Sequence, residues 1–407
     1  MATMFSYKAR DTSSGKITRG TISANSEADA AKSLMAQNIV PLDISPAGDG
    51  GSFFSSFGSR VSAKDRVIFT RQLSTMLNAG LPLAQSLATV EEQTQSRALK
   101  AIVGGISSDI NGGSSLGNAF AKYPKVFNQV YVALVRAGET AGTLDKSLER
   151  LADQEEHDAD MMSKIKGAMY YPAIVLAVII FVIIFMLVSL VPQVAMLYEE
   201  MHQELPIQTI ILVGITTFLM NFWYFIIAAF AVGIFVLRRW IQTESGRKAW
   251  DSLKLNMWPF AQLFRKLYMA RFSRTAQTLL ASGVPMLEVL KISGDAVNNV
   301  VIKEEVMRAR EKVKNGKPLS EGLAGEEYIL PFVGQMSKIG EQSGGIDAML
   351  GKVADYYDKE VDAAISAIST MIEPILMVLM GGMIAFIVFA VLVPIYALTS
   401  SAQSASS

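Results

Sequence analysis

Residues 69–87, FTRQLSTMLNAGLPLAQSL, decide the fold because the chain repeats them as FSRTAQTLLASGVPMLEVL at residues 272–290. Seven of the nineteen positions are identical at a constant separation of 203 residues. The identical positions include one arginine, Arg71 and Arg274, and both members of a Gly-x-Pro corner. Self-similarity at a fixed spacing indicates an internal duplication.

Each copy is predicted to form a helix, a tight corner and a second helix. Gly80 suits the left-handed conformation that closes a helix, Leu81 supplies an apolar contact after it, and Pro82 opens the next helix. Gly283 and Pro285 hold the matching places in the second copy. Apolar side chains at helical spacing predict one buried face, formed by Phe69, Leu73, Met76 and Leu77 and, in the copy, by Phe272, Ala276, Leu279 and Leu280.

The composition predicts a mainly α membrane protein that also has folded aqueous parts. Of 407 residues, 51% are hydrophobic and 18% charged, with a mean hydropathy of +0.31. The 37 basic and 37 acidic residues balance, so net charge gives no reason to expect nucleic acid. No cysteine and only two histidines are present, which argues against disulfides and an ordinary zinc site. We expect no cofactor and no metal.

A second repeated element follows the first. GETAGTLDKSL at residues 138–148 matches GEQSGGIDAML at 340–350, now at a separation of 202, so one residue is lost after Leu116 and its counterpart Leu319. Ser62, with Asp65 three residues later, predicts a capping box that opens the first helical region. Glycine-rich breaks near residues 80, 111–115 and 138–142 then divide it into several helices.

Three uncharged stretches can cross a bilayer. Residues 173–191, 205–237 and 375–397 contain 19, 33 and 23 residues, against about 20 for a 30 Å hydrocarbon core. Lys164 and Lys166 precede the first stretch, and Arg238 and Arg239 follow the second, whereas the intervening loop carries only acidic charges. The positive-inside rule therefore places the N-terminus and both helical regions in the cytoplasm and the C-terminus outside.

The duplication extends into these stretches. Pro172 and Pro374 match at 202 residues, and so do Pro192 and Pro394. Each repeated unit is therefore a cytoplasmic domain with its own exit span, and the middle span, which has no repeated partner, is the return crossing. The predicted segments are a small N-terminal α+β unit at 1–45, a Gly/Ser linker at 46–60, helical domains at 61–168 and 238–371, transmembrane helices at 169–195, 205–237 and 372–397, a periplasmic loop at 196–204 and a periplasmic tail at 398–407.

The sequence contains no Walker A, GxSxG, HExxH or kinase signature, so we expect no enzymatic activity. Three groups of acidic residues remain as candidates. The first lies in the repeated GE-G-D element, where the carboxylates either cap helices or form a charged surface for a partner. Its members are Glu139, Asp145, Glu341 and Asp347.

The second group is the acidic run DQEEHDAD at residues 153–160, in which Asp153, Glu156 and Asp160 share one helical face. A solvated face is favoured over a divalent-cation site, because calcium loops need a turn. The third candidate is Glu373, directly before Pro374, where the first copy has Tyr171 before Pro172. It is either a carboxylate at the membrane interface or, if it lies deeper beside a basic partner, a functional group.

The F-x-R helix with its G-x-P corner, the GE-G-D element and the IEPIL opening of the last span together resemble the type II secretion F family, from residue 4 to residue 398. The resemblance implies an inner-membrane platform protein of type IV pilus or type II secretion machines. It implies helical-bundle domains that contact a hexameric assembly ATPase, and spans that receive pilin or pseudopilin helices. It also implies other inner-membrane assembly proteins as partners and a homo-oligomer.

Type IV pilus assembly is the function we favour, with a type II secretion platform as the alternative. A secondary transporter that uses Glu373 is a competing hypothesis, but three spans and two large cytoplasmic domains argue against it. A membrane-anchored scaffold is a further alternative, which would be preferred if neither an ATPase nor pilins accompanied the protein.

Overall fold

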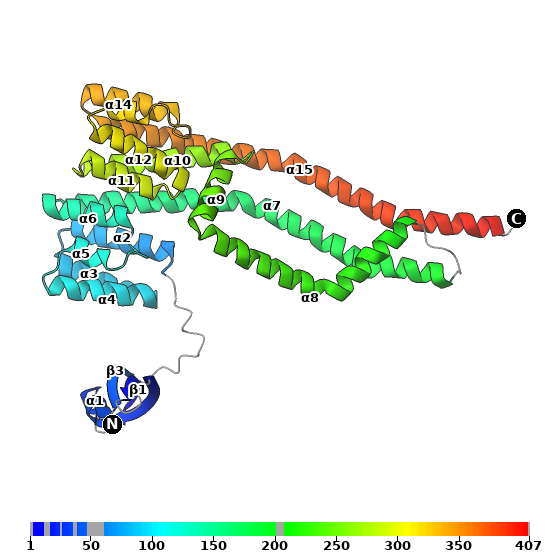
Figure 1. Cartoon of the computed structure of the whole chain (residues 1–407), viewed down its shortest axis with the longest axis horizontal. Coiled ribbons are helices and arrows are strands. Elements are labelled where there is room, and N and C mark those ends of the chain that lie inside the picture. The colour runs from blue at the N-terminus through cyan, green and yellow to red at the C-terminus, as the bar shows by residue number, and fades with distance from the viewer. Residues whose placement is uncertain are drawn as a thin grey trace. The chain divides into compact units, whose positions relative to one another are not determined.

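The structure is a computed structural model that describes residues 3–11, 17–24, 27–35, 39–46, 61–200 and 207–405. It consists of two compact units, residues Met1–Arg60 and Val61–Ser407. Figure 1 shows the helices and strands with the labels used below. Most of the predicted linker at 46–60, part of the predicted periplasmic loop at 196–204 and the end of the tail lie outside the described residues.

The first unit is a three-stranded antiparallel sheet with one helix. Strand β1 (Thr3–Asp11) lies between β2 (Ile17–Ala24) and β3 (Ile39–Pro46), and helix α1 (Glu27–Met35) connects the two outer strands. Phe5 pairs with Ile22 on one side and with Pro46 on the other. Leu34 of α1 is fully buried, which gives this small unit an apolar centre.

The second unit holds both copies of the repeat. The first copy contains α2 (Ala63–Asn78), α3 (Leu83–Gln93), α4 (Arg97–Asn111), α5 (Leu116–Ala121), α6 (Gln129–Ala141) and α7 (Leu144–Glu200). After α8 (Ile207–Ile241) and α9 (Glu244–Asn256), the second copy contains α10 (Ala261–Ala281), α11 (Met286–Ala296), α12 (Val300–Lys314), α13 (Leu319–Leu323), α14 (Pro331–Ser343) and α15 (Ile346–Ala405). The first domain is α2 to the start of α7, and the second is α9 to the start of α15.

The predicted helix corners form in both copies. Gly80 and Gly283 have φ of 82° and 81°, and their N–H groups donate to Leu77 and Leu280 carbonyls. The next residue donates to Met76 and Leu279 respectively, which completes a Schellman motif. Leu81, for which an apolar contact is expected, is 37% exposed, whereas its counterpart Val284 is 8% exposed and belongs to the hydrophobic core.

Other local predictions are also confirmed. Ser62 and Asp65 form the capping box at the start of α2. A one-residue slip is typical of a loop change, but here the difference lies in the short helix, since α5 has six residues and α13 has five. Helices α6 and α14 again have thirteen residues each, so the repeat resumes in register after the short helix.

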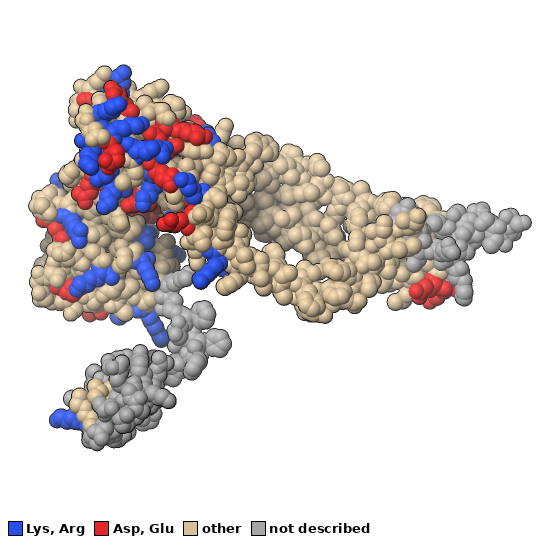
Figure 2. Space-filling model, viewed as in Figure 1, with Lys and Arg blue, Asp and Glu red and all other residues tan. Residues whose placement is uncertain are grey.

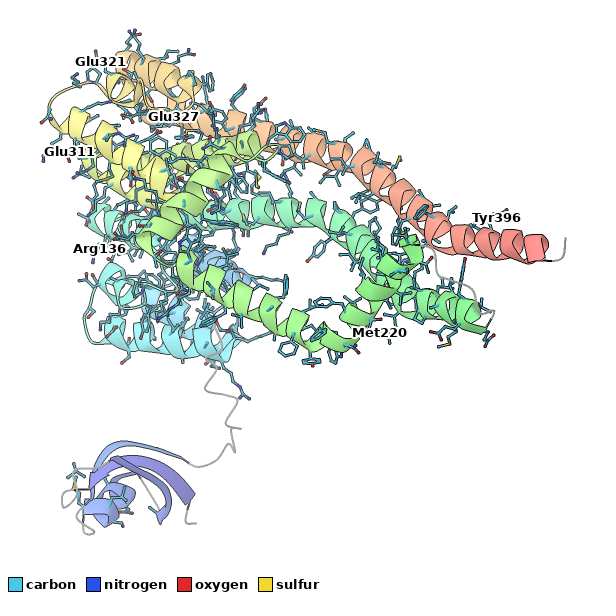
Figure 3. All side chains as sticks on the ribbon, turned by 45° about the vertical axis from the view of Figure 1, so that its right-hand side comes forward. Arg136, Met220, Glu311, Glu321, Glu327 and Tyr396 are labelled. Atoms are coloured by element: carbon cyan, nitrogen blue, oxygen red, sulfur yellow. The ribbon has the colours of Figure 1, made fainter. Side chains whose placement is uncertain are left out.

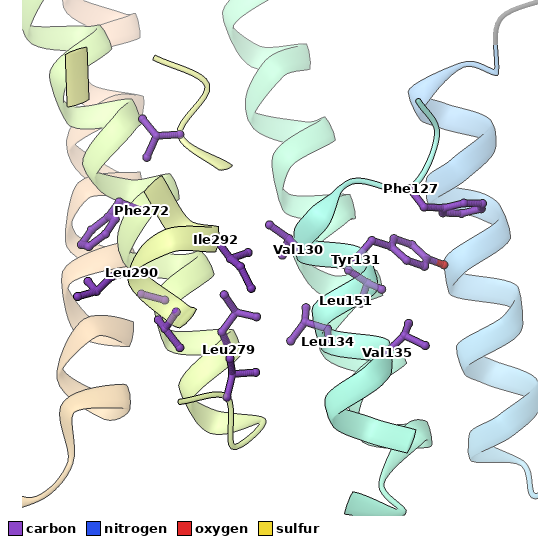
Figure 4. Packing of buried hydrophobic residues seen from close by; sticks show 14 of the residues in the cluster. Phe127, Val130, Tyr131, Leu134, Val135, Leu151, Phe272, Leu279, Leu290 and Ile292 are labelled. Atoms are coloured by element: carbon purple, nitrogen blue, oxygen red, sulfur yellow. The ribbon is translucent and has the colours of Figure 1, made fainter. Parts of the chain in front are cut away.

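The buried side chains of the two domains form one continuous hydrophobic core. In the first domain the core is centred on aromatic rings. The ring centroids of Phe120 and Phe127 are 4.5 Å apart, and those of Phe127 and Tyr131 are 4.7 Å apart. Figure 4 shows Val130 of α6 and Ile292 of α11 pointing toward one another where the two copies meet. The duplicated domains are therefore packed together through apolar side chains rather than merely tethered.

Three helices, α7, α8 and α15, are long and apolar enough to cross a membrane. Figure 2 shows charged side chains gathered over the helical domains, while the visible face of the long apolar helices is uncharged between their ends. Glu199 and Glu200 end α7, and Arg238 and Arg239 lie in the last turn of α8. Figure 3 shows the same contrast between Arg136 or Glu311 on the domains and Met220 on α8. Within the apolar region Met186, Val191, Leu212 and Ala390 pack together.

No break separates the domains from their spans. Helix α7 has 57 residues and α15 has 60, so each extends about 85–90 Å at 1.5 Å per residue. Pro172 and Pro192 lie inside α7, and Pro374 lies inside α15. The boundaries predicted at 168/169 and 371/372 thus fall inside continuous helices, because the change from amphipathic to apolar sequence alters the surroundings without ending the helix.

Candidate functional site

The repeated GE element joins neighbouring helices in each domain. Glu139 of α6 accepts hydrogen bonds from the backbone N–H groups of Leu116 and Gly117, the latter at 2.9 Å, at the start of α5. In the second copy the Glu341 carboxylate accepts two hydrogen bonds from Ser320. The Ser320 backbone nitrogen donates at 3.3 Å and the Ser320 hydroxyl at 2.5 Å. Both glutamates are half-buried. A carboxylate on a helix N-terminus is favourable because it satisfies donors that lack partners within the helix.

The glycine before each glutamate allows a close approach of two helices. A Cβ at Gly138 would lie 2.7 Å from Cβ of Ser147, and one at Gly340 would lie 2.7 Å from Cα of Ile346. Real Cβ atoms do not tolerate such distances, so the position requires glycine. Asp145 and Asp347 lie in the first turns of α7 and α15, where the helix dipole favours an acid. The geometry of the GE-G-D element therefore matches the capping interpretation.

We expect Glu139→Ala to lower the free energy of unfolding by about 1.5–3 kcal/mol, because two amide donors lose a charged acceptor. Asp145→Ala is the matched control, since an acid in the first turn of a helix contributes at most about 1 kcal/mol. Thermal unfolding of the purified chain in detergent measures both. Equal stabilities for the two variants would contradict the capping role and return Glu139 to the candidates for a partner surface.

The repeated arginine of the F-x-R helix binds acids on the long helix of the same domain. Arg71 contacts Glu156 at 2.5 Å and Asp153 at 2.6 Å. Arg274 contacts Asp355 and Asp358, each at 2.6 Å. Asp355 and Asp358 stand 202 residues after Asp153 and Glu156, so the whole cluster is duplicated. It ties α2 to α7 and α10 to α15.

The Arg71 contacts account for two of the five acids in the run at 153–160, namely Asp153 and Glu156. The Arg71 guanidinium lowers the pKa of Glu156, and the two carboxylates raise the pKa of Arg71. Asp160 lies exposed on α7, away from this arginine's bonds. Among the residues that the structure describes, no group of three side chains forms a candidate metal site.

A further set of polar contacts joins the two domains. Arg150 of α7 donates to the Ala281 carbonyl of α10 at 2.6 Å, and the Gln154 amide donates to Thr275 at 3.0 Å. Lys164 lies 2.8 Å from Asp362 of α15. These contacts form what is called here the seam between the two domains. A cleft opens beside the seam and is lined by α2, α6 and α7 on one side and by α11 and α12 on the other. The seam holds the domains at the level where α7 and α15 run together.

His157 is the titratable centre of this seam. Its Nε2 lies 3.0 Å from Oδ2 of Asp358, which the Arg274 guanidinium also contacts. The contact with Asp358 raises the pKa of His157, although partial burial opposes the shift. Burial acts to raise the pKa of Asp358 as well, but the bonds from His157 and Arg274 outweigh it and the pKa is lowered. The seam therefore favours a protonated histidine.

This contact predicts a pH dependence of stability. Because the folded pKa of His157 is raised, its stabilisation is fully present below the unfolded value of about 6.5 and is lost as pH rises through the folded pKa. The midpoint temperature of thermal unfolding should decrease as the pH is raised from 6 to 8, and the decrease should be smaller in the His157→Gln variant. His202→Gln, at the only other histidine in the sequence, is the control. An unchanged profile in His157→Gln would refute the assignment.

Glu373 lies exposed on α15 and has no basic side chain of the described residues within salt-bridge distance. Tyr171, its counterpart on α7, is 62% exposed. The condition attached to a functional role for Glu373, a basic partner within the spans, is thus not met among these residues. Pro172 is half-buried and Pro374 exposed, each within an unbroken helix.

Comparison with known families now identifies the repeated unit. The family model described as "Type II secretion system (T2SS), protein F" matches residues 69–192 and again residues 272–394. The chain belongs to the type II secretion system protein F family. The model of this family's N-terminal domain matches residues 1–45. Each protein F match begins at the F-x-R helix and ends at Pro192 or Pro394, so the family's repeated domain contains a helical domain and its apolar span.

Curated protein F relatives resemble the chain over nearly their full length. A type IV pilus assembly protein PilC from Thermus thermophilus is 37% identical over 398 residues, 97% of each chain. PilC from Myxococcus xanthus is 35% identical, covering 98% of this chain and 96% of its own. A type II secretion system protein F from Aeromonas hydrophila is 33% identical, covering 90% and 96%.

Sequence reasoning missed two features of this protein F structure. The salt bridge between Arg66 and Glu155, at 2.5 Å, joins residues far apart in sequence and has no counterpart in the second copy. The seam contact between His157 and Asp358 joins the two copies, so a comparison of one copy with the other does not show it. The arginine clusters could have been found, because Asp153 and Glu156 recur as acids at the repeat spacing.

Proposed function

We propose that this chain is the inner-membrane platform protein of a type IV pilus assembly machine. In this role it couples a hexameric cytoplasmic ATPase to the polymerisation of pilin. The similarity to two PilC proteins, at 37% and 35% identity, supports a pilus over the type II secretion pseudopilus, for which the relative cited is 33% identical. The secretion platform remains the second candidate because both kinds of relative share the family's repeated domain.

One observation carries the proposal. Helices α7 and α15 each begin in a domain core and continue without a break through an apolar span. A rotation or tilt of the paired domains would therefore be transmitted to the spans, where it can displace a pilin helix. The domains lack a nucleotide-binding signature in the sequence, so the energy would come from the ATPase partner.

The charges that flank the spans support a cytoplasmic position for the domains. Lys164, Lys166, Arg238 and Arg239 lie at their domain ends, whereas Glu199 and Glu200 lie at the far end of α7. This distribution follows the positive-inside rule, which supports a periplasmic C-terminus. Association into dimers or larger homo-oligomers would place several sets of spans around one filament base.

Deletion of the gene tests the proposed function. A strain without the chain should lose surface pili while keeping pilin in its membrane, and the intact chain should restore them. Cross-linking in native membranes should join the helical domains to the assembly ATPase and the spans to pilin. Loss of protein secretion with normal piliation would instead establish the secretion platform, and a chain that binds neither partner would overturn both.

A further inference from the structure

Helix α9 and the residues that flank its two ends expose apolar side chains, although they belong to a charged domain. Leu253 is 49% exposed, Met257 40% and Trp258 76%, and Trp240, in the last turn of α8, is 46% exposed. Leu253 and Met257 are four residues apart and so share one helical face. Large exposed apolar side chains that gather at one place mark a surface that something else covers.

The opposite face of α9 is fixed to the domain. Asp251 is 3% exposed and accepts from the Val300 backbone at 2.9 Å, while Leu255 is fully buried. At the other end, a Cβ on Gly246 would lie 2.0 Å from the Trp240 carbonyl oxygen, so α9 turns tightly away from α8. Figure 1 shows α9 lying across the direction of α7 and α15. The exposed face is therefore held in one orientation.

The turn after α9 lies at the depth where the spans begin. Phe260 and Leu263 pack in a cluster with Ile165 of α7 and Ile372 of α15. Ile165 stands next to Lys166, after which α7 becomes apolar, and Ile372 stands next to Glu373, the last charged residue of the chain. Trp258 is two residues from Phe260, so it lies near the level of both membrane entry points.

We propose that Trp240, Leu253, Met257 and Trp258, here called the α9 corner, bind the phospholipid headgroup layer of the cytoplasmic leaflet. Tryptophan is enriched at this level because its ring is apolar and its N–H is polar. Arg238 and Arg239, directly before Trp240, supply positive charge that suits anionic headgroups. Trp240 lies in the last turn of span α8 itself, and this favours lipid over another protein as the occupant.

The α9 corner would make the two domains unequal. Helix α10 corresponds to α2 of the first domain. Helix α2 begins at Ala63, directly after the Ser62 cap. Among the described residues, no helix packs directly before α2 in the way that α9 precedes α10. The second domain would then be held at a fixed depth by α8, α9 and α15. Among the described residues, the first domain would be joined to the membrane by α7 alone, apart from its contacts with the second.

Spin labels on single cysteines test the proposal, and the sequence contains no native cysteine to remove. The full chain is reconstituted into vesicles of phosphatidylethanolamine and phosphatidylglycerol, with labels at Trp258→Cys and Leu253→Cys. Accessibility to oxygen, which enters lipid, is compared with accessibility to a water-soluble nickel complex. Phe181→Cys, exposed on the α7 span, is the lipid control, and Lys317→Cys, exposed between α12 and α13, is the water control.

The expected oxygen-to-nickel accessibility ratio at Trp258→Cys and Leu253→Cys lies between the two controls, about threefold or more above Lys317→Cys, as the headgroup level requires. A ratio equal to that of Lys317→Cys would overturn the proposal. Protection from both reagents would also overturn it, because a protein would then cover the corner. The thermal midpoint of each labelled chain confirms that it is folded.

Discussion

Replacing Arg66 with methionine is expected to lower the free energy of unfolding of the first domain by about 3–5 kcal/mol. Arg66 Nε lies 2.5 Å from Glu155 Oε2, and its Nη1 donates to the Val126 carbonyl at 3.1 Å. Glu155 is only 8% exposed, and burial raises its pKa even though Arg66 opposes the shift. Without the arginine, an ionised carboxylate would stay in the core with no compensating charge.

The second domain shows how this loss can be repaired. At the positions that match Arg66, Tyr131 and Glu155 it has apolar or aromatic residues, namely Met269, Val333 and Tyr357. All three are buried, at 0%, 0% and 4% exposed. The same backbone therefore accommodates either an ion pair beside a tyrosine from α6, or a methionine beside a tyrosine from α15.

The triple variant R66M/Y131V/E155Y should consequently recover most of the stability that R66M loses. Replacing a buried ion pair with well-packed apolar groups is often neutral or stabilising, whereas removing one partner is not. Thermal and denaturant unfolding in detergent measure both chains. Equal losses in the single and the triple variant would show that the ion pair itself, rather than the unpaired charge, decides stability.

The pH dependence of R66M provides an independent check. The folded pKa of Glu155 is already raised, and loss of Arg66 removes a charge that lowers it. The deficit of R66M should therefore grow as pH rises through the folded pKa of Glu155 and shrink as pH falls below the ordinary value of about 4.3. A deficit that stays constant over this range would mean that Glu155 does not carry it.

The sequence predicts those structural features that are determined by residues close together in the chain, such as helix corners and helix caps. The Gly80 corner and the Ser62 capping box are specified within a few residues, and both form as predicted. The three apolar stretches lie in helices that are long and apolar enough to cross a membrane. The pattern predicts an apolar contact for Leu81, yet Leu81 is 37% exposed while its counterpart Val284 is buried, because burial of the residue after a corner depends on the helix opposite. Local chemistry thus fixes the corner but not its surroundings.

The candidate site was harder to predict because its partners are distant in sequence. The repeat predicts that Glu139 is either a helix cap or part of a partner surface, but it does not indicate which helix is capped, because that helix begins 23 residues earlier. Arg66 and Glu155 are separated by 89 residues, and the second copy has neither charge. The seam at His157 depends on how the two copies pack, and the repeat comparison treats each copy alone.

Introducing glycine where the first domain meets its span is expected to abolish pilus assembly without preventing folding. The variant is A168G/M169G/Y170G, and its control is M169A/Y170A, which removes the same side chains but keeps a strong helix former at all three positions. Met169 and Tyr170 are 45% and 67% exposed, so neither variant disturbs the domain core. Each glycine costs about 1 kcal/mol of helix stability relative to alanine, or about 3 kcal/mol in all.

The reason for the expected loss is mechanical. If α7 transmits motion from the domain to the span, a flexible glycine segment within α7 would bend, and the motion would not reach the membrane. On the proposed function, the glycine variant should insert, keep the contacts between the domains and bind the ATPase, but its pilus count should fall by about tenfold or more, a loss equal to at least 1.4 kcal/mol of coupling. The alanine control should assemble pili at nearly the parent level. Normal piliation in the glycine variant would show that the continuity of α7 is structural, and force would then have to reach pilin through α15 or through the domains themselves.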